Sequence, residues 1–568
     1  MKKLLHLLLL FCFLLYSLPE AGFAQVGWSK SYDNAAVVTA EQRASEVGRQ
    51  ILERGGNAID AAIAVQFTLA VTLPRAGNIG GGGFMVVHLE DGTTRALDFR
   101  EKAPSRSTED MFIRNGEYQP DLSRRSVLAS GVPGVVDGMI KAAERYGHLP
   151  LETILEPAIR LAREGYELSW IQARDLNNHA ESFKKYESST AYFTKEIGEP
   201  YEEGDLFVQE DLAETLERIA RFGRGGFYSG RTAEMIVNEM KKHGGIISYR
   251  DLQNYESTWR DPIKATFLGY ELNIMPPPSS GSIAIAQILY MIDEHDLKET
   301  GFNSPSYIHL VTEAMRRAFA DRAYFLGDPD FVNIPTEKLL SESYNTERFQ
   351  SFNPQKASSS DEIDHGSIPS FQVTESSETT HFSIVDKDGN AVAVTTTLNG
   401  SYGNHLAVGG AGFLLNNEMD DFTAQPGEPN MFGLIQGKAN AVEPGKRMLS
   451  SMSPTIVTRG DSVRMVLGAA GGPRIITATL QNFLNIAVFQ MNPMQALTAP
   501  RFHHQWLPDQ LYYETYGITQ DTRRSLTQMG HTLSTTDGIG RSHIIYVDEE
   551  AKRRGAADPR GNGYVTGY

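Results

Sequence analysis

Hydroxyl and amide side chains cluster around a predicted β-hairpin in the last third of the chain, where they could perform nucleophilic chemistry. Thr379 begins a strongly β-patterned segment that contains Asp388-Gly389, a dipeptide typical of two-residue hairpin turns. Centring the turn on this dipeptide places Thr379 opposite Thr397 and Asn399, which share one face of the returning strand. Two hydroxyls beside an amide suit an activated oxygen nucleophile, although threonine is also common in strands for its β propensity alone.

Two other features are ambiguous when taken by themselves. The adjacent glycines Gly471 and Gly472 are typical of an ordinary turn. Arg100 follows a predicted hairpin of strands over 84–88 and 94–99. By residue type alone it is expected to form a surface ion pair.

The elements that must position these residues change in character along the chain. Apolar spacing predicts a first helix that begins at a capping box, Thr39 to Gln42, and an alanine-rich helix over 58–71 that Asn57 caps. A glycine run at 80–83 is predicted to form a tight backbone turn before the first strand. Helices are predicted to dominate residues 130–350, at 133–146, 151–164, 209–221, 232–242 and 304–324.

Composition limits the fold and excludes several classes of protein. The chain has 568 residues, of which 41% are hydrophobic, enough for one large domain or two to three smaller ones. The net charge of −17 argues against a nucleic-acid partner. The single cysteine, Cys12, excludes a cysteine-built zinc or iron–sulfur site and an internal disulfide. A polar segment with few core residues, 356–378, precedes the hairpin, and a chain can be cut in such a segment without losing its core.

Residues 1–24 are predicted to be a secretory signal peptide. Two lysines precede an apolar run of about 15 residues, and the small residues Gly22 and Ala24 stand at the −3 and −1 positions of the expected cleavage after Ala24. The run is shorter than the roughly 20 residues that span a bilayer, and no later stretch is long and apolar enough to do so. We therefore expect an exported protein, periplasmic or secreted, with no membrane span after processing.

Three sequence blocks, Thr379–Asn399, Asn416–Phe422 and Leu449–Thr455, together closely resemble the γ-glutamyltransferases, members of the N-terminal-nucleophile hydrolase superfamily. The resemblance extends over nearly the whole chain after the predicted signal peptide. It implies an α+β fold, a four-layer αββα sandwich that two pieces of one precursor build together.

Members of this family cut themselves before the first threonine of a Thr-Thr-His motif, which here is the Glu378–Thr379 bond. The hydroxyl of Thr379 would attack the Glu378 carbonyl, and hydrolysis of the resulting ester would free a new α-amine. The expected products are a large subunit, 25–378, and a small subunit, 379–568, paired as a heterodimer. The new amine has a reference pKa of about 7.7–8.0 and could act as the base, although a bound water is an alternative.

The resemblance also implies roles for residues around Thr379. Thr397 matches the threonine that hydrogen-bonds the nucleophile, and Gly471 and Gly472 match the oxyanion-hole pair. A γ-glutamyl group carries an α-carboxylate and an α-ammonium, and the matching side chains divide between the two charges. The residues implied for the carboxylate are Arg100, Ser450 and Ser451, and those implied for the ammonium are Asn399, Glu418 and Asp421.

Two positions depart from the pattern of bacterial relatives. Glu418 stands where many have glutamine, which adds negative charge beside the ammonium and could alter specificity. Residues 424–440 match the lid loop of those bacterial members that have one. Phe432 replaces the tyrosine often found in that loop, which puts one lid-anchoring hydrogen bond in question.

The implied activity is transfer of the γ-glutamyl group of glutathione and related small molecules to water, amino acids or peptides, without a cofactor. His503 and His504 would point to opposite faces of a strand and lack a third ligand, so no metal site is expected. One alternative is a glutaryl-type β-lactam acylase, which would leave Glu418 and Asp421 without purpose. Others are a poly-γ-glutamate-processing enzyme, whose polymer the lid would obstruct, and a non-catalytic exported γ-glutamyl-binding protein with an uncut chain.

Overall fold

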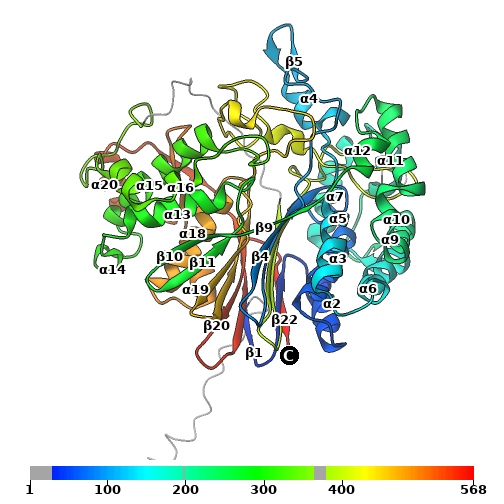
Figure 1. The fold of residues 1–568 in the computed structure, drawn as a ribbon, viewed down its shortest axis with the longest axis horizontal. Helices are drawn as coiled ribbons and strands as arrows, with labels where there is room; N and C mark the ends of the chain where they lie inside the picture. The colour runs from blue at the N-terminus through cyan, green and yellow to red at the C-terminus, as the bar shows by residue number, and fades with distance from the viewer. Residues whose placement is uncertain (1–28, 196–198, 364–378) are drawn as a thin grey trace, which may run out of the picture.

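The chain folds into four layers, in which two β-sheets face each other and helices cover both outer faces (Figure 1). The computed structural model describes residues 29–195, 199–363 and 379–568, so the expected signal peptide and Glu378 lie outside the described residues. All strand pairs within the two sheets are antiparallel. This arrangement is the αββα sandwich expected from the sequence.

The predicted hairpin lies in the middle of one sheet. Its two strands pair with each other and with a neighbour on each side, so every residue of both strands is buried. In the described part of the chain this sheet has seven strands, in the order β22 (Tyr564–Gly567), β2 (Ala36–Thr39), β12 (Thr380–Val385), β13 (Ala391–Thr397), β3 (Gly82–His88), β4 (Thr94–Asp98) and β9 (Thr258–Arg260).

The second sheet packs face to face against the first. Small and branched side chains fill the space between the sheets, among them Phe84 and Ala393 from the first and Val466 and Ile545 from the second. Such interdigitation of inner faces is the usual core of a β-sandwich. The strands of this sheet are β1 (Ser29–Tyr32), β21 (Arg553–Ala557), β20 (Arg541–Val547), β15 (Ser462–Leu467), β14 (Thr455–Arg459), β11 (Tyr270–Ile274) and β10 (Ile263–Phe267), with β16 (Ala469–Ala470) paired to β20.

One helical layer covers the sheet that contains the hairpin, and its colours run from blue through cyan to green in Figure 1. Its central helix, α3 (Ala58–Thr72), is buried at every residue and contacts both hairpin strands. Alanine-rich composition allows this close approach between a helix and a sheet. The other helices of this layer are α2 (Gln42–Glu53), α5 (Val135–Tyr146), α6 (Leu151–Glu164), α7 (Trp170–Phe183), α8 (Glu187–Phe193), α9 (Glu210–Phe222), α10 (Gly225–Tyr228), α11 (Gly230–His243) and α12 (Tyr249–Gln253).

The other helical layer covers the second sheet. A continuous apolar cluster joins its helices to the sheet, with Ile288, Met315 and Leu480 among the fully buried members. The layer contains α13 (Gly281–Ile292), α14 (Leu297–Thr300), α15 (Pro305–Phe325), α16 (Thr336–Leu339), α17 (Glu342–Phe349), α18 (Arg474–Ala487), α19 (Pro493–Thr498) and α20 (Gln520–Gln528). Three short strands lie beside this layer, β17 (Phe502–His503), β18 (Leu511–Glu514) and β19 (Leu533–Thr536).

The remaining short elements lie outside the two main sheets. They are β5 (Ile113–Arg114), β6 (Glu117–Tyr118), α4 (Pro120–Arg124), β7 (Tyr166–Glu167) and β8 (Leu206–Phe207).

The predicted helices agree with the structure to within a few residues, and the predicted cap Asn57 is present. Asn57 caps α3 through its side chain, and Ser304 caps α15 with Pro305 in the first turn. The first helix is different from the prediction because Glu41, not Thr39, is its N-cap. The Glu41 carboxylate accepts a hydrogen bond from the backbone of Ala44, whereas Thr39 ends strand β2.

Two further expectations needed revision. The mainly helical region 130–350 also contains β9, which extends the first sheet beside β4, and β10 and β11, which form a hairpin about Gly269 and extend the second sheet. The glycine run at 80–83 is required because neighbouring segments of the chain pack closely against it. A Cβ on Gly81 would lie 2.1 Å from the carbonyl oxygen of Thr397. Among the described residues, none of the helices has both the length and the apolar character needed to cross a bilayer.

Candidate active site

The observed hairpin has the register that the turn dipeptide predicts. Thr380 pairs with Thr396, so Thr379 comes next to the position of Thr397 at the open end of the hairpin. The strands connect through a loop in which the Asp386 N–H donates to the Asn390 carbonyl at 3.0 Å. The sequence therefore predicted this pairing correctly.

One pocket, with a volume of about 320 Å³, gathers nearly all of the predicted site residues from five separate parts of the chain. Gly471 adjoins this pocket through Gly472, and Glu378 lies outside the described residues. The sequence-predicted residues that line the pocket are Arg100, Thr379, Thr397, Asn399, Glu418, Asp421, Phe432, Ser450, Ser451 and Gly472.

The nucleophile end of the pocket is held by the hairpin and the bend that follows it. Thr379 is 7% exposed, and the Thr397 hydroxyl accepts a hydrogen bond from the Asn399 N–H at 2.7 Å. Asn399 adopts a left-handed backbone conformation, with φ of 75°, and its side-chain NH₂ donates to the Asn417 carbonyl at 3.0 Å. This bond orients the amide so that its oxygen is the atom able to accept from a bound ammonium.

The two glycines occupy the turn that opens helix α18. Gly471 and Gly472 have φ values of 132° and 55°, which L side chains rarely adopt. Their carbonyls accept from Arg474 and Ile475 in the first turn of the helix, whereas neither glycine N–H donates to another described residue. Free N–H groups at a helix N-terminus suit a developing negative charge on oxygen.

A buried ion cluster forms the opposite wall. The backbone N–H of Arg100 donates to Asp98 and its Nε donates to the Met448 carbonyl, so its two terminal nitrogens face the pocket. Nη1 bonds the Glu418 carboxylate and Nη2 lies 2.5 Å from Asp421 Oδ2. The sequence predicted all three residues but assigned them to opposite charges of a ligand, whereas here they pair with one another.

A third carboxylate, Glu101, was not predicted and extends this cluster. Its Oε2 lies 3.6 Å from Arg100 Nη1, it is fully buried, and neither of its oxygens accepts a hydrogen bond from another described residue. Burial, opposed by Arg100, raises the pKa of Glu101 to about 7 and that of Asp421 to about 6. Burial also raises the pKa of Glu418 well above its usual range. One guanidinium therefore serves three carboxylates that hold protons more tightly than usual.

The serine pair and a second arginine complete the pocket. The Ser450 hydroxyl accepts from the Met452 N–H at 3.1 Å, and the Ser451 hydroxyl accepts from Arg322 Nη2 at 3.4 Å. Arg322 comes from helix α15 and was not predicted. No sequence pattern marks it, because it looks like any polar residue of a long helix until the helix packs beside the serine loop.

The predicted lid segment is anchored by bonds other than a tyrosine hydroxyl. The Asn430 NH₂ donates to Asp421 Oδ1 at 3.1 Å, and the amide oxygen of Asn430 accepts from the N–H groups of Phe432 and Leu434. A Cβ on Gly472 would lie 2.7 Å from Phe432 Cδ1, so the phenyl ring packs directly over the glycine turn. The loss of a tyrosine hydroxyl at 432 therefore does not detach the lid.

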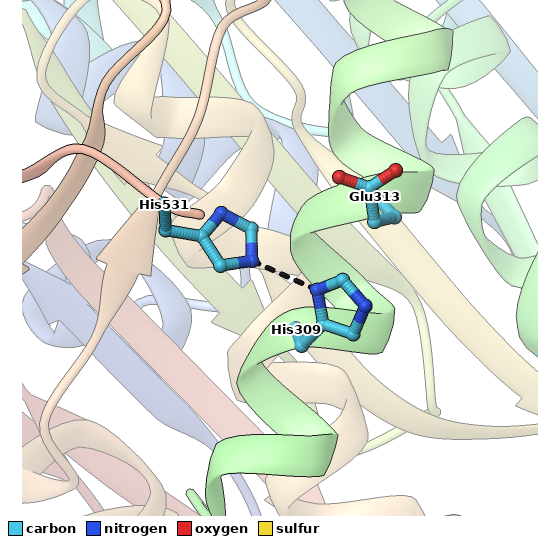
Figure 2. Close-up of side chains that lie close together, drawn as sticks. All are labelled: His309, Glu313 and His531. Carbon is cyan, nitrogen blue, oxygen red and sulfur yellow. Dashed lines mark hydrogen bonds between the residues drawn. The ribbon is translucent and has the colours of Figure 1, made fainter. Parts of the chain in front are cut away.

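Away from the pocket, Figure 2 shows a group of buried side chains of types that can bind metals, His309, Glu313 and His531. His309 Nδ1 is hydrogen-bonded to His531 Nε2 at 2.8 Å. The Glu313 carboxylate forms ion pairs with Arg316 and Arg317, which lower its pKa to about 2 against the effect of burial. These bonds engage the atoms that an ion would need, so we assign the group a structural role.

The histidine pair at 503–504 is also engaged in structural contacts. His503 Nδ1 bonds the Thr477 hydroxyl at 2.9 Å, and His504 Nε2 lies 3.1 Å from Asp509 Oδ1. Burial lowers the pKa of both histidines, to about 3 and about 4. The two side chains therefore have separate partners, as the strand geometry predicted.

Comparison with known proteins identifies the family. Residues 44–568 match the family described as Gamma-glutamyltranspeptidase. The glutathione hydrolase proenzyme of Escherichia coli (strain K12) is 46% identical over 526 residues, which cover 92% of this chain and 90% of the relative.

Two solved structures are similar in fold. The cephalosporin acylase from Bacillus halodurans has a TM-score of 0.85 at 27% identity, covering 97% of this chain and 99% of that one. A chain of Helicobacter pylori gamma-glutamyltranspeptidase has a TM-score of 0.57 at 47% identity, covering 58% of this chain and 94% of that one. These similarities confirm the N-terminal-nucleophile hydrolase fold expected from the sequence. Because the match spans nearly the whole chain, the protein belongs to the gamma-glutamyltranspeptidase family.

Proposed function

We propose that this protein is a self-processed γ-glutamyltransferase that forms a γ-glutamyl ester on the hydroxyl of Thr379. One observation carries the proposal: Thr379 shares a pocket with a buried guanidinium, Arg100, and with two carboxylates, Glu418 and Asp421. A hydroxyl, a cation and anions in one small pocket match the reacting and charged parts of a γ-glutamyl group. Membership of the family gives the class of reaction, cleavage of γ-glutamyl compounds such as glutathione.

Processing comes first in this account. The hydroxyl of Thr379 attacks the Glu378 carbonyl, the acyl group passes from nitrogen to oxygen, and water hydrolyses the ester. The products are a large subunit, 25–378, and a small subunit, 379–568, which stay paired because both sheets contain strands of each subunit hydrogen-bonded to strands of the other. The freed α-amine, with a reference pKa of about 7.7–8.0, is then beside the hydroxyl it can deprotonate, directly or through water.

Acyl transfer then repeats the same attack on a substrate. The hydroxyl of Thr379 adds to the γ-carbonyl, and the N–H groups of Gly471 and Gly472 bind the oxyanion at the start of helix α18. One such donor typically contributes about 10²–10³ in rate. The tetrahedral intermediate expels the amine, which leaves with a proton, and water or an amino acid or peptide takes the acyl group from the ester. Thr397 hydrogen-bonds and orients the nucleophile.

Recognition of the substrate depends on the exchange of ion pairs within the protein for ion pairs with the substrate. The substrate α-carboxylate binds Arg100 with Ser450 and Ser451, and the α-ammonium binds Asn399, Glu418 and Asp421. Arg100 pairs with those same two carboxylates, so an incoming amino-acid group replaces each partner with one of like charge. A ligand that lacks either charge leaves a buried ion without its new partner, which penalises binding.

The leaving group and the acceptor need space on the other side of the nucleophile. Thr379 also lines a second, larger cavity of about 1230 Å³ that includes Arg75, Gln172 and Tyr402. We propose that this cavity admits the acceptor. Residues 1–24 are proposed to direct export and to be removed.

The enzymatic test uses a chromogenic γ-glutamyl anilide with and without glycylglycine. We expect two subunits on a denaturing gel, the smaller beginning at Thr379, and anilide release that depends on the γ-glutamyl group. A glutaryl anilide, which lacks the ammonium, should be a much poorer substrate. Better turnover of the glutaryl compound would favour the acylase alternative, and an uncut, inactive chain would favour a binding protein.

A further inference from the structure

We propose that Arg322 is a second cationic contact for the α-carboxylate of the γ-glutamyl group and therefore a specificity-determining residue. The inference rests on the proposed function and extends it, since the sequence resemblance assigned the carboxylate to Arg100 and the serine pair alone. Three observations support the inference: the position of Arg322, its hydrogen bonds, and its lack of an ion-pair partner among the described residues.

Arg322 is placed for this role by helix α15. It is 2% exposed and lines the same pocket as Thr379. Its Nε donates to the Ser280 hydroxyl at 2.9 Å, and that hydroxyl donates to the Ser450 carbonyl at 2.7 Å. Its Nη2 points to the Ser451 hydroxyl. The guanidinium is thus attached to both members of the serine pair.

The terminal nitrogens of Arg322 are only weakly engaged. Nη1 lies 3.4 Å from the amide oxygen of Gln436, and Nη2 lies 3.4 Å from the Ser451 hydroxyl. Normal N–H···O bonds measure about 2.7–3.2 Å, so both contacts are long. Both acceptors are also neutral. These two nitrogens can therefore turn to a stronger acceptor without giving up a good hydrogen bond.

The two arginines of the pocket differ in how their charge is balanced. Three carboxylates lie within 3.6 Å of the terminal nitrogens of Arg100. In contrast, none of the ion pairs among the described residues includes Arg322. A buried charge without a counter-ion is costly unless a ligand supplies one. Burial accordingly lowers the pKa of Arg322 to about 10, with Asp421 opposing the effect. The pocket therefore has an unmatched cation beside the serines and an excess of anions beside Arg100.

A γ-glutamyl group fits this division of charge. Its carboxylate and ammonium are attached to one carbon, so an ammonium held by Glu418 and Asp421 brings the carboxylate to the serine side, where Arg322 lies. The carboxylate would then bridge Arg100 and Arg322. A competing ligand is the terminal carboxylate of a peptide leaving group, and an anilide substrate removes this possibility because its leaving group is neutral.

The test compares two substrates within each protein preparation. One is L-γ-glutamyl-p-nitroanilide, and the other is its α-carboxamide analogue, which keeps the shape but loses the negative charge. For each variant the ratio of the two kcat/KM values is measured, because a ratio is independent of the fraction of active enzyme.

The variants are Arg322→Gln and the charge-preserving Arg322→Lys. Arg317→Gln is the matched control, since Arg317 is a buried arginine of the same helix that pairs with Glu313 outside the pocket.

We expect Arg322→Gln to lower the carboxylate-to-carboxamide ratio by about 10- to 100-fold, mainly through KM, as loss of a charged hydrogen bond predicts. Arg322→Lys should recover part of the loss, and Arg317→Gln should keep the wild-type ratio. If Arg322→Gln slows both substrates equally, or if wild type does not prefer the carboxylate, the inference is wrong. If Arg322→Gln fails to fold, Arg322→Met, which also removes the charge, takes its place, and an unchanged ratio in that variant contradicts the inference equally. Wild-type protein inactive on both anilides would instead overturn the proposed function.

Discussion

Arg100 and Asp421 form a buried ion pair, with Nη2 2.5 Å from Oδ2, inside a pocket that also contains Thr379. The guanidinium is fully buried and Glu418 is its second partner. The charges that complement an amino-acid head group are therefore paired with one another in an internal salt bridge. Binding then exchanges one set of ion pairs for another, which keeps charges satisfied in both states and favours ligands with both charges.

Replacing Arg100 should separate binding from processing. Arg100→Ala removes a cation for the substrate carboxylate and leaves three carboxylates to protonate, so we expect kcat/KM for γ-glutamyl anilide to fall by about 10²-fold or more, chiefly through KM. Self-cleavage involves no α-carboxylate and should still yield two subunits on a gel. Wild-type kcat/KM in this variant would show that the assignment of the carboxylate site is wrong.

Glu418 should contribute to recognition of the ammonium. Glu418→Gln keeps the shape and returns the residue common in bacterial relatives, so we expect stable protein. The preference for the γ-glutamyl over the glutaryl anilide should decrease by about tenfold, because a charged hydrogen bond becomes a neutral one. Kinetics with both anilides measure this, and Ser105→Ala, outside the pocket, serves as the control. An unchanged preference would remove Glu418 from the ammonium site.

Ligand binding should release protons between about pH 5 and 7. The pKa of Asp421 is raised to about 6 and that of Glu101 to about 7, from ordinary values of 3.8 and 4.5. A bound ammonium favours the ionised carboxylates, so it expels the protons that they hold. Calorimetric titration with L-glutamate at pH 6, in two buffers of different ionisation enthalpy, should show net proton release, whereas glutarate should not. Proton uptake with L-glutamate would contradict the assignment.

The same pKa shifts fix the sign of a stability change. Because the folded protein holds these protons at pH values where the unfolded chain has lost them, their contribution to the free energy of unfolding falls as pH rises from about 4.5 to 7. Glu101→Gln, which removes the group with the higher pKa, should flatten this part of the profile. Chemical denaturation of wild type and variant at several pH values measures the difference, and a profile as steep as that of wild type would exclude Glu101 as its source.

The glycine turn and the lid should be coupled. Gly472 has φ of 55°, and a Cβ there would lie 2.7 Å from Phe432 Cδ1, so Gly472→Ala should lower kcat by about tenfold or more through strain and displacement of the turn. Adding Phe432→Ala removes the clash and should restore part of the loss. A double-mutant cycle on kcat measures the coupling, and strictly additive effects would show that ring and turn act independently.

Local chemistry explains which parts of the fold and site were predictable. The turn dipeptide and the period of two fixed the hairpin register, so the positions of Thr379 and Thr397 followed from neighbours in sequence. Most helices followed from apolar spacing. Strands β9 to β11 were missed because each is short, and because β9 and β11 also pair with strands from distant parts of the chain.

Other parts of the site depend on tertiary packing and left no signal in the sequence. Glu101 joins the ion cluster through its contact with Arg100, and Arg322 lines the pocket only after helix α15 packs beside the serine loop. Asn430 anchors the lid by donating a hydrogen bond to Asp421. The replacement of tyrosine by Phe432, which drew attention to the lid, gives no indication of this contact. The resemblance implied the types and roles of the site residues. The pairing of Arg100 with the carboxylates of the proposed ammonium site became clear only from the structure.

The central claim is that a cut before Thr379 creates the hydroxyl that carries the acyl group. The direct test is rapid quenching of turnover with a γ-glutamyl anilide, followed by intact-mass and peptide mass spectrometry of the small subunit, with Thr379→Ala as the control. We predict a small subunit that begins at Thr379 and gains the mass of one glutamyl residue on that threonine, and an uncut, inactive variant. A glutamyl adduct on any other residue, or turnover by Thr379→Ala, would contradict the account.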